Sequence, residues 1–141
     1  MERTVILIKP DAIKKGVVGE IISRLEKAGF TLVAAKFIRL SDDLLDQWYA
    51  HHREKPFFPS LKAFMQETPV LAMLWEGKDI VSRVRLLRGP TDSKKAAKGT
   101  IRGDFGSDIQ QNAIHTSEDE VAAKREIDLM FSPSEIYEYR K

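Results

Sequence analysis

The chain has 141 residues, of which 43% are hydrophobic and 31% charged, a size and composition typical of a folded domain. Its net charge of +2 is too small to predict a general affinity for nucleic acids or membranes, and the absence of cysteine excludes disulfides, thiolate metal sites and cysteine nucleophiles. No apolar run approaches the roughly 18 residues of a membrane-spanning helix, and the N-terminal segment lacks the basic start and cleavage site of a signal peptide. We therefore expect one cytoplasmic domain, residues 1–141.

The first half of the chain alternates between strand and helix patterns. Residues 3–9 (RTVILIK) form a dense β-branched run that predicts a buried strand. Apolar residues then recur at helical spacing over 21–28, before a glycine that is a natural helix end. Residues 30–40 predict a second strand, and Ser41 is a suitable cap for a following helix that continues through 44–52.

The second half repeats this alternation around a long basic segment. Residues 59–64 predict a short helix with proline in its first turn, and 70–76 predict a third strand. A helix over 78–89 precedes the basic segment, which is followed by a short strand near 113–115 and a last helix over 117–131. This order predicts an α+β fold of the ferredoxin-like βαββαβ type, a four-stranded antiparallel sheet with helices on one face and added helices.

The basic segment, residues 83–102 (RVRLLRGPTDSKKAAKGTIR), contains seven lysines or arginines and one aspartate, a local charge of +6. Such a run is usually a solvated surface loop. Here it is an unusually long connection, and long loops in small domains are often functional. Arg85 and Arg102 bracket a glycine-containing loop with the Thr91 hydroxyl inside it, which would suit a clamp for a polyphosphate.

Other candidate residues are dispersed along the chain. Lys9 comes at the end of the first predicted strand, where its charge could reach a phosphate, although an ordinary edge lysine has the same pattern. Phe57 and Phe58 stand between two prolines; we expect one in the core and the other free to stack on a nucleobase. The adjacent pair His51–His52 is read as two surface histidines, because neighbouring helical residues point about 100° apart.

His115 is the only candidate nucleophile in the C-terminal half, and a neutral imidazole is suited to carry phosphate as a labile phosphoramidate. Ser117 and Glu120 have the spacing of a capping box, which places the histidine directly before a helix N-terminus that favours anions. Glu126 is a candidate to orient the imidazole, although its spacing does not show whether the two side chains touch.

The motifs NAIHTS, GTIRGDF, LIKPDA and KPFF, in their order and spacing, resemble those of nucleoside diphosphate kinases over essentially the whole chain. The resemblance implies the ferredoxin-like fold with added helices and a Mg²⁺-dependent, ping-pong transfer of the γ-phosphate from a nucleoside triphosphate, mainly ATP, to a nucleoside diphosphate. It also implies a homo-oligomer, tetramer or hexamer, with no membrane and no obligate nucleic-acid partner.

Carried over to this chain, the resemblance makes His115 the phosphorylated residue, supported by Glu126 and Ser117. It also implies that Phe57 is the base-stacking residue, which leaves Phe58 to the core. By the same resemblance, the family's nucleotide-contacting and catalytic positions correspond in this chain to Lys9, Tyr49, Arg85, Thr91, Arg102 and Asn112. Mg²⁺ is expected on the β- and γ-phosphates without a dedicated protein cage, in keeping with its preference for phosphate and water oxygens.

The sequence departs from the family pattern at two positions. Thr116 stands where the family usually has glycine or alanine, and Glu118 stands where it usually has aspartate. A β-branched residue directly after the nucleophile restricts the backbone there. We expect the chemistry to persist with altered local packing.

Two other functions fit parts of the sequence. A ferredoxin-like sheet can be an RNA-binding module, but the basic segment lacks interleaved aromatic residues and an RNP-like motif. A phosphohistidine carrier that passes phosphate between proteins would need neither a base platform nor an arginine clamp. Binding of free nucleotide therefore distinguishes an enzyme from such a carrier.

Overall fold

Strand β1 (Glu2–Ile8) lies inside the sheet, because residues 4–8 are fully buried and apolar side chains point to both faces. It pairs antiparallel with β3 (Val70–Gly77) on one side and β4 (Ile114–Thr116) on the other. Strand β2 (Thr31–Ile38) pairs antiparallel with β3, which gives the order β2-β3-β1-β4. This computed structural model describes residues 1–139, and it confirms the expected four-stranded antiparallel sheet.

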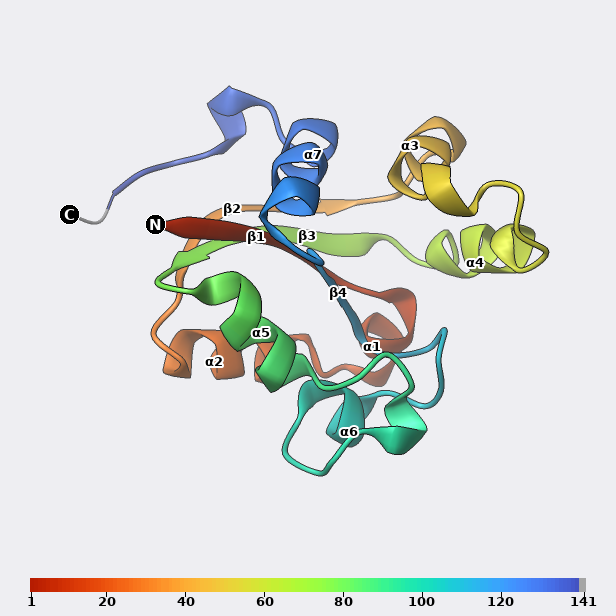
Figure 1. Ribbon diagram of the computed structural model, residues 1–141, viewed down its shortest axis with the longest axis horizontal. Helices are drawn as coiled ribbons and strands as arrows, with labels where there is room; N and C mark the ends of the chain where they lie inside the picture. Colours follow the sequence, from red (N-terminus) through yellow and green to blue (C-terminus); the bar gives the residue numbers. More distant parts are fainter. Residues whose placement is uncertain (140–141) are drawn as a thin grey trace.

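Helices cover both faces of this sheet (Figure 1). On one face, α2 (Val18–Lys27) and α5 (Ile80–Arg88) pack on a core that includes Ile6 and Ile8. They are the two crossover helices of the expected βαββαβ pattern. The added helices α3 (Asp42–Trp48) and α7 (Glu120–Met130) cover the opposite face, over a second core that includes Val5 and Leu7.

The predicted start of α3 is confirmed, since Ser41 Oγ accepts a hydrogen bond from the Leu44 amide at 3.1 Å. The helix ends at Trp48, earlier than expected, and continues as the 3₁₀ turn Ala50–His52. Proline lies in the first turn of α4 (Phe58–Met65), as the sequence predicts. Within residues 1–139, no helix has the length and apolar character to cross a membrane.

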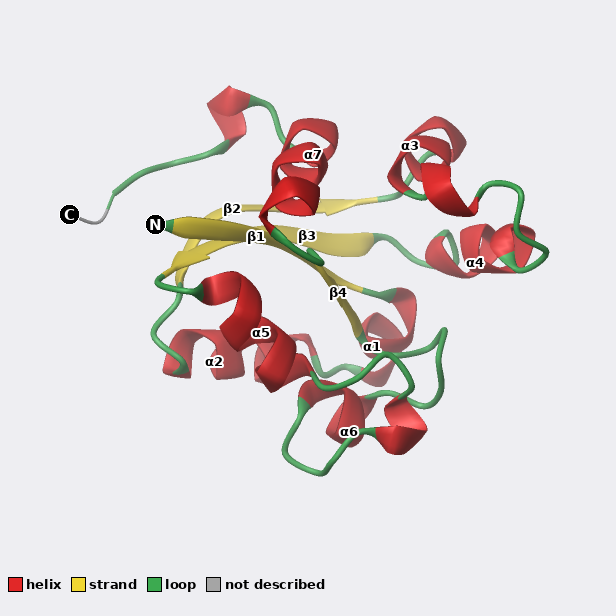
Figure 2. Ribbon diagram, in the orientation of Figure 1, coloured by secondary structure: helices red, strands yellow, loops and turns green. Residues whose placement is uncertain are grey.

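Two short helices were not predicted. Pro10 does not merely end β1 but begins α1 (Pro10–Lys15), where its missing N–H costs nothing. The basic segment contains a 3₁₀ turn, Ser93–Lys95, and the helix α6 (Ile101–Phe105) begins at its end, both visible beside long loops in Figure 2. Thr100 caps α6, because its Oγ1 accepts a hydrogen bond from the Gly103 amide at 3.0 Å. Helix α6 thereby gives Arg102 a fixed position.

Gly103 is required by the packing of α6 against the preceding turn. A Cβ atom built there would lie 2.0 Å from the Ala97 carbonyl oxygen, which is backbone and has no rotamer to change. We expect Gly103→Ala to lower the free energy of unfolding by about 2–3 kcal/mol. The matched control is Gly19→Ala in α2, where no atom lies within 4 Å and helix propensity predicts a gain of about 0.5–1 kcal/mol. Urea unfolding of both variants measures the difference, and equal stabilities would contradict the prediction.

The expected capping box at Ser117 and Glu120 is wrong. Helix α7 begins at Glu120, and its cap is Asp119, whose Oδ1 accepts a hydrogen bond from the Ala122 amide at 2.7 Å. Ser117 still belongs to the extended chain after β4, so its hydroxyl reaches the neighbouring strand and accepts from the Val5 amide at 3.0 Å. His115 therefore does not stand directly at a helix N-terminus.

Candidate active site

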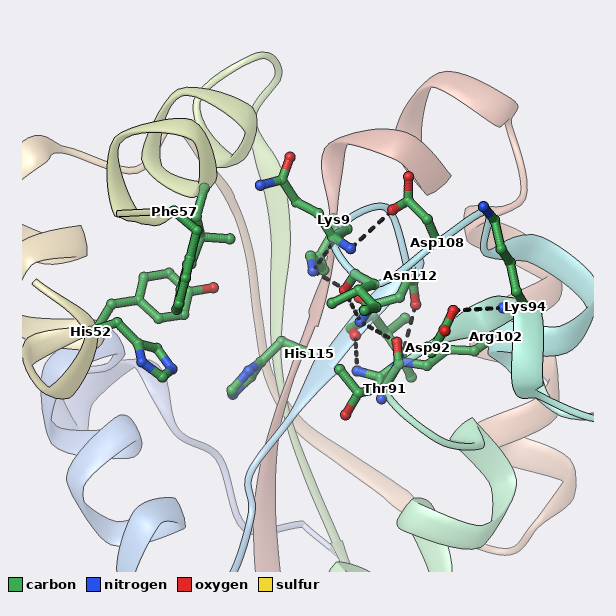
Figure 3. Close-up of a pocket in the computed structure, with 15 residues that line it drawn as sticks. Lys9, His52, Phe57, Thr91, Asp92, Lys94, Arg102, Asp108, Asn112 and His115 are labelled. Carbon is green, nitrogen blue, oxygen red and sulfur yellow. Dashed lines mark hydrogen bonds between the residues drawn. The ribbon is translucent and has the colours of Figure 1, made fainter. Parts of the chain in front are cut away.

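A cavity of about 640 Å³ opens beside the end of β4. Figure 3 shows Phe57 and His52 on one side, Lys9 and Thr91 on the other, and His115 between them. The wall also contains Tyr49, Leu61, Asp92, Lys94, Arg102, Asp108, Ile109, Gln110, Asn112 and Ile114. One wall is thus aromatic, and the other, which we call the cationic wall, combines the cations Lys9, Lys94 and Arg102 with Asp92 and Asp108. All but one of the predicted nucleotide-contacting residues line this space, and the exception is Arg85.

The backbone before His115 makes a tight γ-turn. Ala113 has a φ of +71°, and the Ile114 amide donates to the Asn112 carbonyl at 2.9 Å. Such a conformation is unfavourable for a residue with a Cβ and persists only where neighbouring contacts fix it. One such contact comes from Asp11 in α1, whose Oδ2 accepts from the Ala113 amide at 2.9 Å.

Arg102 fixes the same turn from the α6 side. Its Nη2 donates to the Ile114 carbonyl at 2.8 Å, and its Nε donates to the Asn112 carbonyl at 3.2 Å. The side chain is buried, and this burial lowers the pKa of Arg102 to about 9, with the charge of Arg88 acting in the same direction. Arg102 therefore combines a structural role in the turn with a positive charge at the cavity.

Lys9 reaches the turn from the end of β1. Its ammonium group donates to Asn112 Oδ1 at 2.7 Å and to the Gln110 carbonyl at 2.9 Å. Only 6% of the residue is exposed, and burial, followed by the charge of Arg102, lowers the pKa of Lys9 to about 8. Asn112 in turn contacts the basic segment, because its Nδ2 donates to the Thr91 carbonyl at 3.1 Å. These contacts join β1, the basic segment and the turn into one unit.

His115 is held on one side by an acid and on another by an aromatic ring. Its Nε2 lies 2.9 Å from Glu126 Oε1 on α7, and its ring meets the edge of Trp48 with centroids 5.2 Å apart. A carboxylate can only accept, so Nε2 carries the hydrogen and Nδ1 keeps the free lone pair. Within residues 1–139, Nδ1 makes no hydrogen bond. The arrangement leaves a nucleophilic nitrogen available.

Ser117 connects this acid to the sheet. Its buried hydroxyl donates to Glu126 Oε1 at 2.8 Å while accepting from the Val5 amide at 3.0 Å. We expect Ser117→Ala to lower the free energy of unfolding by about 1–3 kcal/mol, because two buried groups lose their partner. Thermal unfolding measures the loss, with Ser82→Ala on the exposed face of α5 as the control. An unchanged melting temperature would contradict the assignment.

Tyr49 lies at the inner end of the aromatic wall. Burial raises the pKa of the Tyr49 phenol above its usual value, and the negative charge of Glu126 acts in the same direction. The hydroxyl therefore stays protonated and can donate a hydrogen bond at neutral pH. Its ring also meets Phe58 with centroids 6.4 Å apart, which fixes its position.

The two adjacent phenylalanines have different environments. Phe58 is buried in the core, whereas Phe57 is 47% exposed on the cavity wall, which is the division expected from the sequence. His52 meets the Phe57 ring with centroids 5.2 Å apart and also lines the cavity. The sequence did not single out His52 for this wall. Its ring lies 3.9 Å from that of His51, its neighbour in the 3₁₀ turn.

Arg85 lies outside the cavity wall. Its guanidinium is half exposed and pairs with the Glu118 carboxylate at 3.3 Å. The structure therefore does not bring Arg85 together with Lys9 and Arg102. Arg88, one turn further along α5, lies closer to the site and was not singled out by the sequence patterns.

The cavity offers no cluster of protein ligands for a metal. Within residues 1–139, no three His, Cys, Asp or Glu side chains come together in a metal-binding arrangement. The two cavity aspartates already accept backbone hydrogen bonds: Asp92 from Lys94, and Asp108 from Gln110 and Gln111. These bonds use only Oδ1 of each aspartate, so either Oδ2 could serve as a single protein ligand, the other ligands of a cation being oxygens of a bound phosphate and of water.

A free imidazole nitrogen in a cavity with one aromatic wall and one that contains several cations is the arrangement expected of a nucleotide-dependent phosphotransferase. The model of the nucleoside diphosphate kinase family matches residues 2–136. The chain therefore belongs to the nucleoside diphosphate kinase family, and its activity is that of a nucleoside-diphosphate kinase.

Individual relatives agree with this assignment over the full length. The chain is 48% identical to a nucleoside diphosphate kinase of Natronomonas pharaonis, an alignment that covers 99% of this chain and 92% of the relative. It superposes on a Halobacterium salinarum nucleoside diphosphate kinase in complex with CDP with a TM-score of 0.96 and 46% identity, covering 99% and 93% of the two chains. For the Aquifex aeolicus nucleoside diphosphate kinase the TM-score is 0.93 at 44% identity, with 96% and 99% covered.

Proposed function

We propose that His115 is the residue that carries phosphate between the two nucleotides. The observation that supports this role is the Glu126 carboxylate at 2.9 Å from Nε2, which fixes the tautomer with its lone pair on Nδ1. The imidazole is 20% exposed at the cavity, so a phosphate can approach it. Trp48 and Glu126 together limit rotation of the ring, which favours a defined line of attack.

In the proposed reaction, the Nδ1 lone pair attacks the γ-phosphorus of the nucleoside triphosphate in line with the leaving oxygen. The N–P bond forms while the bond from phosphorus to the β,γ-bridging oxygen breaks, and the nucleoside diphosphate leaves with that electron pair. A second diphosphate then enters the same cavity and its terminal oxygen takes the phosphoryl group back by the reverse step. Nε2–H continues to donate to Glu126 throughout.

We assign the phosphates to the cationic wall. Lys9, Arg102 and the Thr91 hydroxyl line this wall beside His115, where positive charge stabilises the oxygens of the transferring group. Asn112 fixes Lys9, and the neutral Tyr49 phenol can donate from the opposite side. We include Arg85 as a phosphate contact that must first leave Glu118.

We propose Mg²⁺ as the cofactor, bound through the β- and γ-phosphates, as is general in the family. The cation supplies charge neutralisation of the phosphate oxygens. The chain's own contribution would be to hold those phosphates with Lys9, Thr91 and Arg102.

The nucleobase is assigned to Phe57. Its exposed ring offers a stacking surface of the kind that accepts any base, which predicts broad base tolerance. ATP as the main donor is proposed from the family resemblance alone. A cytidine nucleotide is bound in the complex of the Halobacterium salinarum relative, and we propose that this chain accepts cytidine diphosphate in the same way.

The experiment that tests the proposal is labelling with γ-³²P-ATP and Mg²⁺. We expect up to one label per chain, stable in base and labile in acid, that is discharged completely by any nucleoside diphosphate. Initial rates should give the parallel double-reciprocal lines of a ping-pong mechanism. Label that is stable in acid, or that water but no diphosphate discharges, would contradict it.

We further propose that residues 1–141 act as a single domain in a cytoplasmic homo-oligomer, tetramer or hexamer, without a nucleic-acid partner. The family resemblance of the full chain supports this assembly. Light scattering of the purified chain distinguishes the two stoichiometries, and a monomer at micromolar concentration would contradict both.

A further inference from the structure

Arg88, the last residue of α5, is an internal arginine beside the proposed phosphate site. Only 7% of it is exposed. Its Nη1 donates to the Thr116 hydroxyl at 2.5 Å, and its Nε donates to the Gly89 carbonyl at 3.2 Å. Within residues 1–139, its Nη2 makes no hydrogen bond. The guanidinium is thus fixed at two nitrogens and free at the third.

A second arginine shares one of these contacts. Arg102 Nη1 donates to the same Gly89 carbonyl at 3.4 Å, so two buried guanidinium groups lie side by side. In the part of the chain that the structure describes, neither group has a carboxylate within 4.0 Å. Burial lowers the pKa of both arginines, and each is also lowered by a neighbouring arginine. The charge of Glu118 partly offsets this for both arginines, but no carboxylate in residues 1–139 is in direct contact with either. Two adjacent internal cations without a direct ion pair favour the binding of an anion.

The space next to Arg88 indicates where that anion would lie. Arg88 does not line the main cavity but an adjoining one of about 640 Å³, which is bounded by His115, by the end of α3 with the 3₁₀ turn Ala50–His52, and by α7. His115, Thr91 and Arg102 line both cavities. Glu118 also faces the second cavity and its charge acts on Arg88, but its carboxylate pairs with Arg85 at 3.3 Å.

We propose that Arg88 is a further catalytic residue, which binds the phosphoryl group through Nη2 as that group moves onto His115. Thr116 fixes its guanidinium, so the β-branched residue after the nucleophile has a function in orienting this cation. The proposed contact is with the transferring group rather than with the α- and β-phosphates. The inference rests on the proposed role of His115.

The test compares two measurements on Arg88→Met, which removes the charge and keeps an unbranched side chain. We expect the single-turnover rate of phosphoenzyme formation from saturating Mg²⁺–ATP to fall about 100-fold, as when one donor to a transition-state oxyanion is removed. The dissociation constant of ADP, which lacks the transferred group, should stay within about twofold of the wild-type value. Arg88→Lys restores the positive charge without the planar, paired N–H donors of a guanidinium, so it should recover part of the rate.

Arg83→Met is the matched control on the same helix, because Arg83 donates to the Ala28 and Lys78 carbonyls away from the site. Its phosphorylation rate should equal that of the wild type. A rate for Arg88→Met within twofold of the control would overturn the proposal. A parallel loss of rate, ADP affinity and melting temperature would also overturn it and make Arg88 a structural residue. A wild-type chain that takes no label on His115 contradicts the proposed function itself.

Discussion

Replacing His115 with glutamine reduces phosphate transfer between nucleotides by at least about 10⁴-fold, because an amide nitrogen has no lone pair that attacks phosphorus. The substitution leaves the cationic wall and Phe57 in place, so ADP still binds with nearly the wild-type affinity. Labelling with γ-³²P-ATP measures the covalent step, and calorimetric titration with ADP measures binding. Loss of both would indicate a misfolded variant, which circular dichroism detects.

The matched control is His51→Gln, which changes a histidine that does not line the main cavity. This variant should take the same amount of label as the wild type. If His115→Gln kept its label, the phosphate would be on another residue, and the proposed role of the Glu126 contact would be wrong. If His51→Gln lost its label while His115→Gln kept it, the phosphate would likewise be on a residue other than His115.

The strands could be predicted from the sequence because their signal is local. The β-branched run in β1 and the apolar run in β3 identify strands buried on both faces, and the helices between them have apolar stripes at helical spacing. The short helices α1 and α6 could not be found this way. Helices of five or six residues are not stable alone, so tertiary contacts such as those around Gly103 decide whether they form.

The candidate site could be predicted as a set of residues but not as an arrangement. Lys9 and Asn112 are 103 positions apart in the chain, and their hydrogen bond depends on the antiparallel pairing of β1 with β4. The same pairing brings Ser117 to Val5, where it is no longer a helix cap. Arg88 had the pattern of an ordinary basic residue at a helix C-terminus, and only its burial against Thr116 distinguishes it.

Replacing Lys9 with methionine is expected to have the second-largest effect, a fall in kcat/KM of about 10²–10³-fold at pH 7. Lys9 is the only lysine on the cavity wall that directly contacts the turn before His115, in the part of the chain described by the structure. Methionine preserves the length of the side chain but removes the charge. The matched control is Lys14→Met, since Lys14 is exposed and pairs with Glu67 outside the cavity.

The pH dependence of activity distinguishes loss of this charge from a general disturbance. Burial lowers the pKa of Lys9 from 10.5 to about 8, so the protonated form that attracts phosphate is lost as the pH rises through about 8. The wild-type kcat/KM should therefore fall on the alkaline side of pH 8. The residual activity of Lys9→Met should lack the decline near pH 8 and fall only above about pH 9, where Arg102 loses its charge. A variant that keeps the same alkaline decline would show that another group causes it.

The lowered pKa of Lys9 also makes stability depend on pH, but stability rises with pH where activity falls. Because the folded state has the lower pKa, the unfolded chain binds more protons between pH 8 and 10.5, and the free energy of unfolding rises with pH across this window. Below pH 8 the charged, buried Lys9 lowers stability by a constant amount of about 3 kcal/mol. Urea unfolding at pH 7 and pH 10 should thus show a larger gain for the wild type than for Lys9→Met, in which only Arg102 still contributes to the rise. Equal gains in the two proteins would mean that Lys9 titrates normally, and that its burial is compensated by its hydrogen bonds to Asn112 and Gln110.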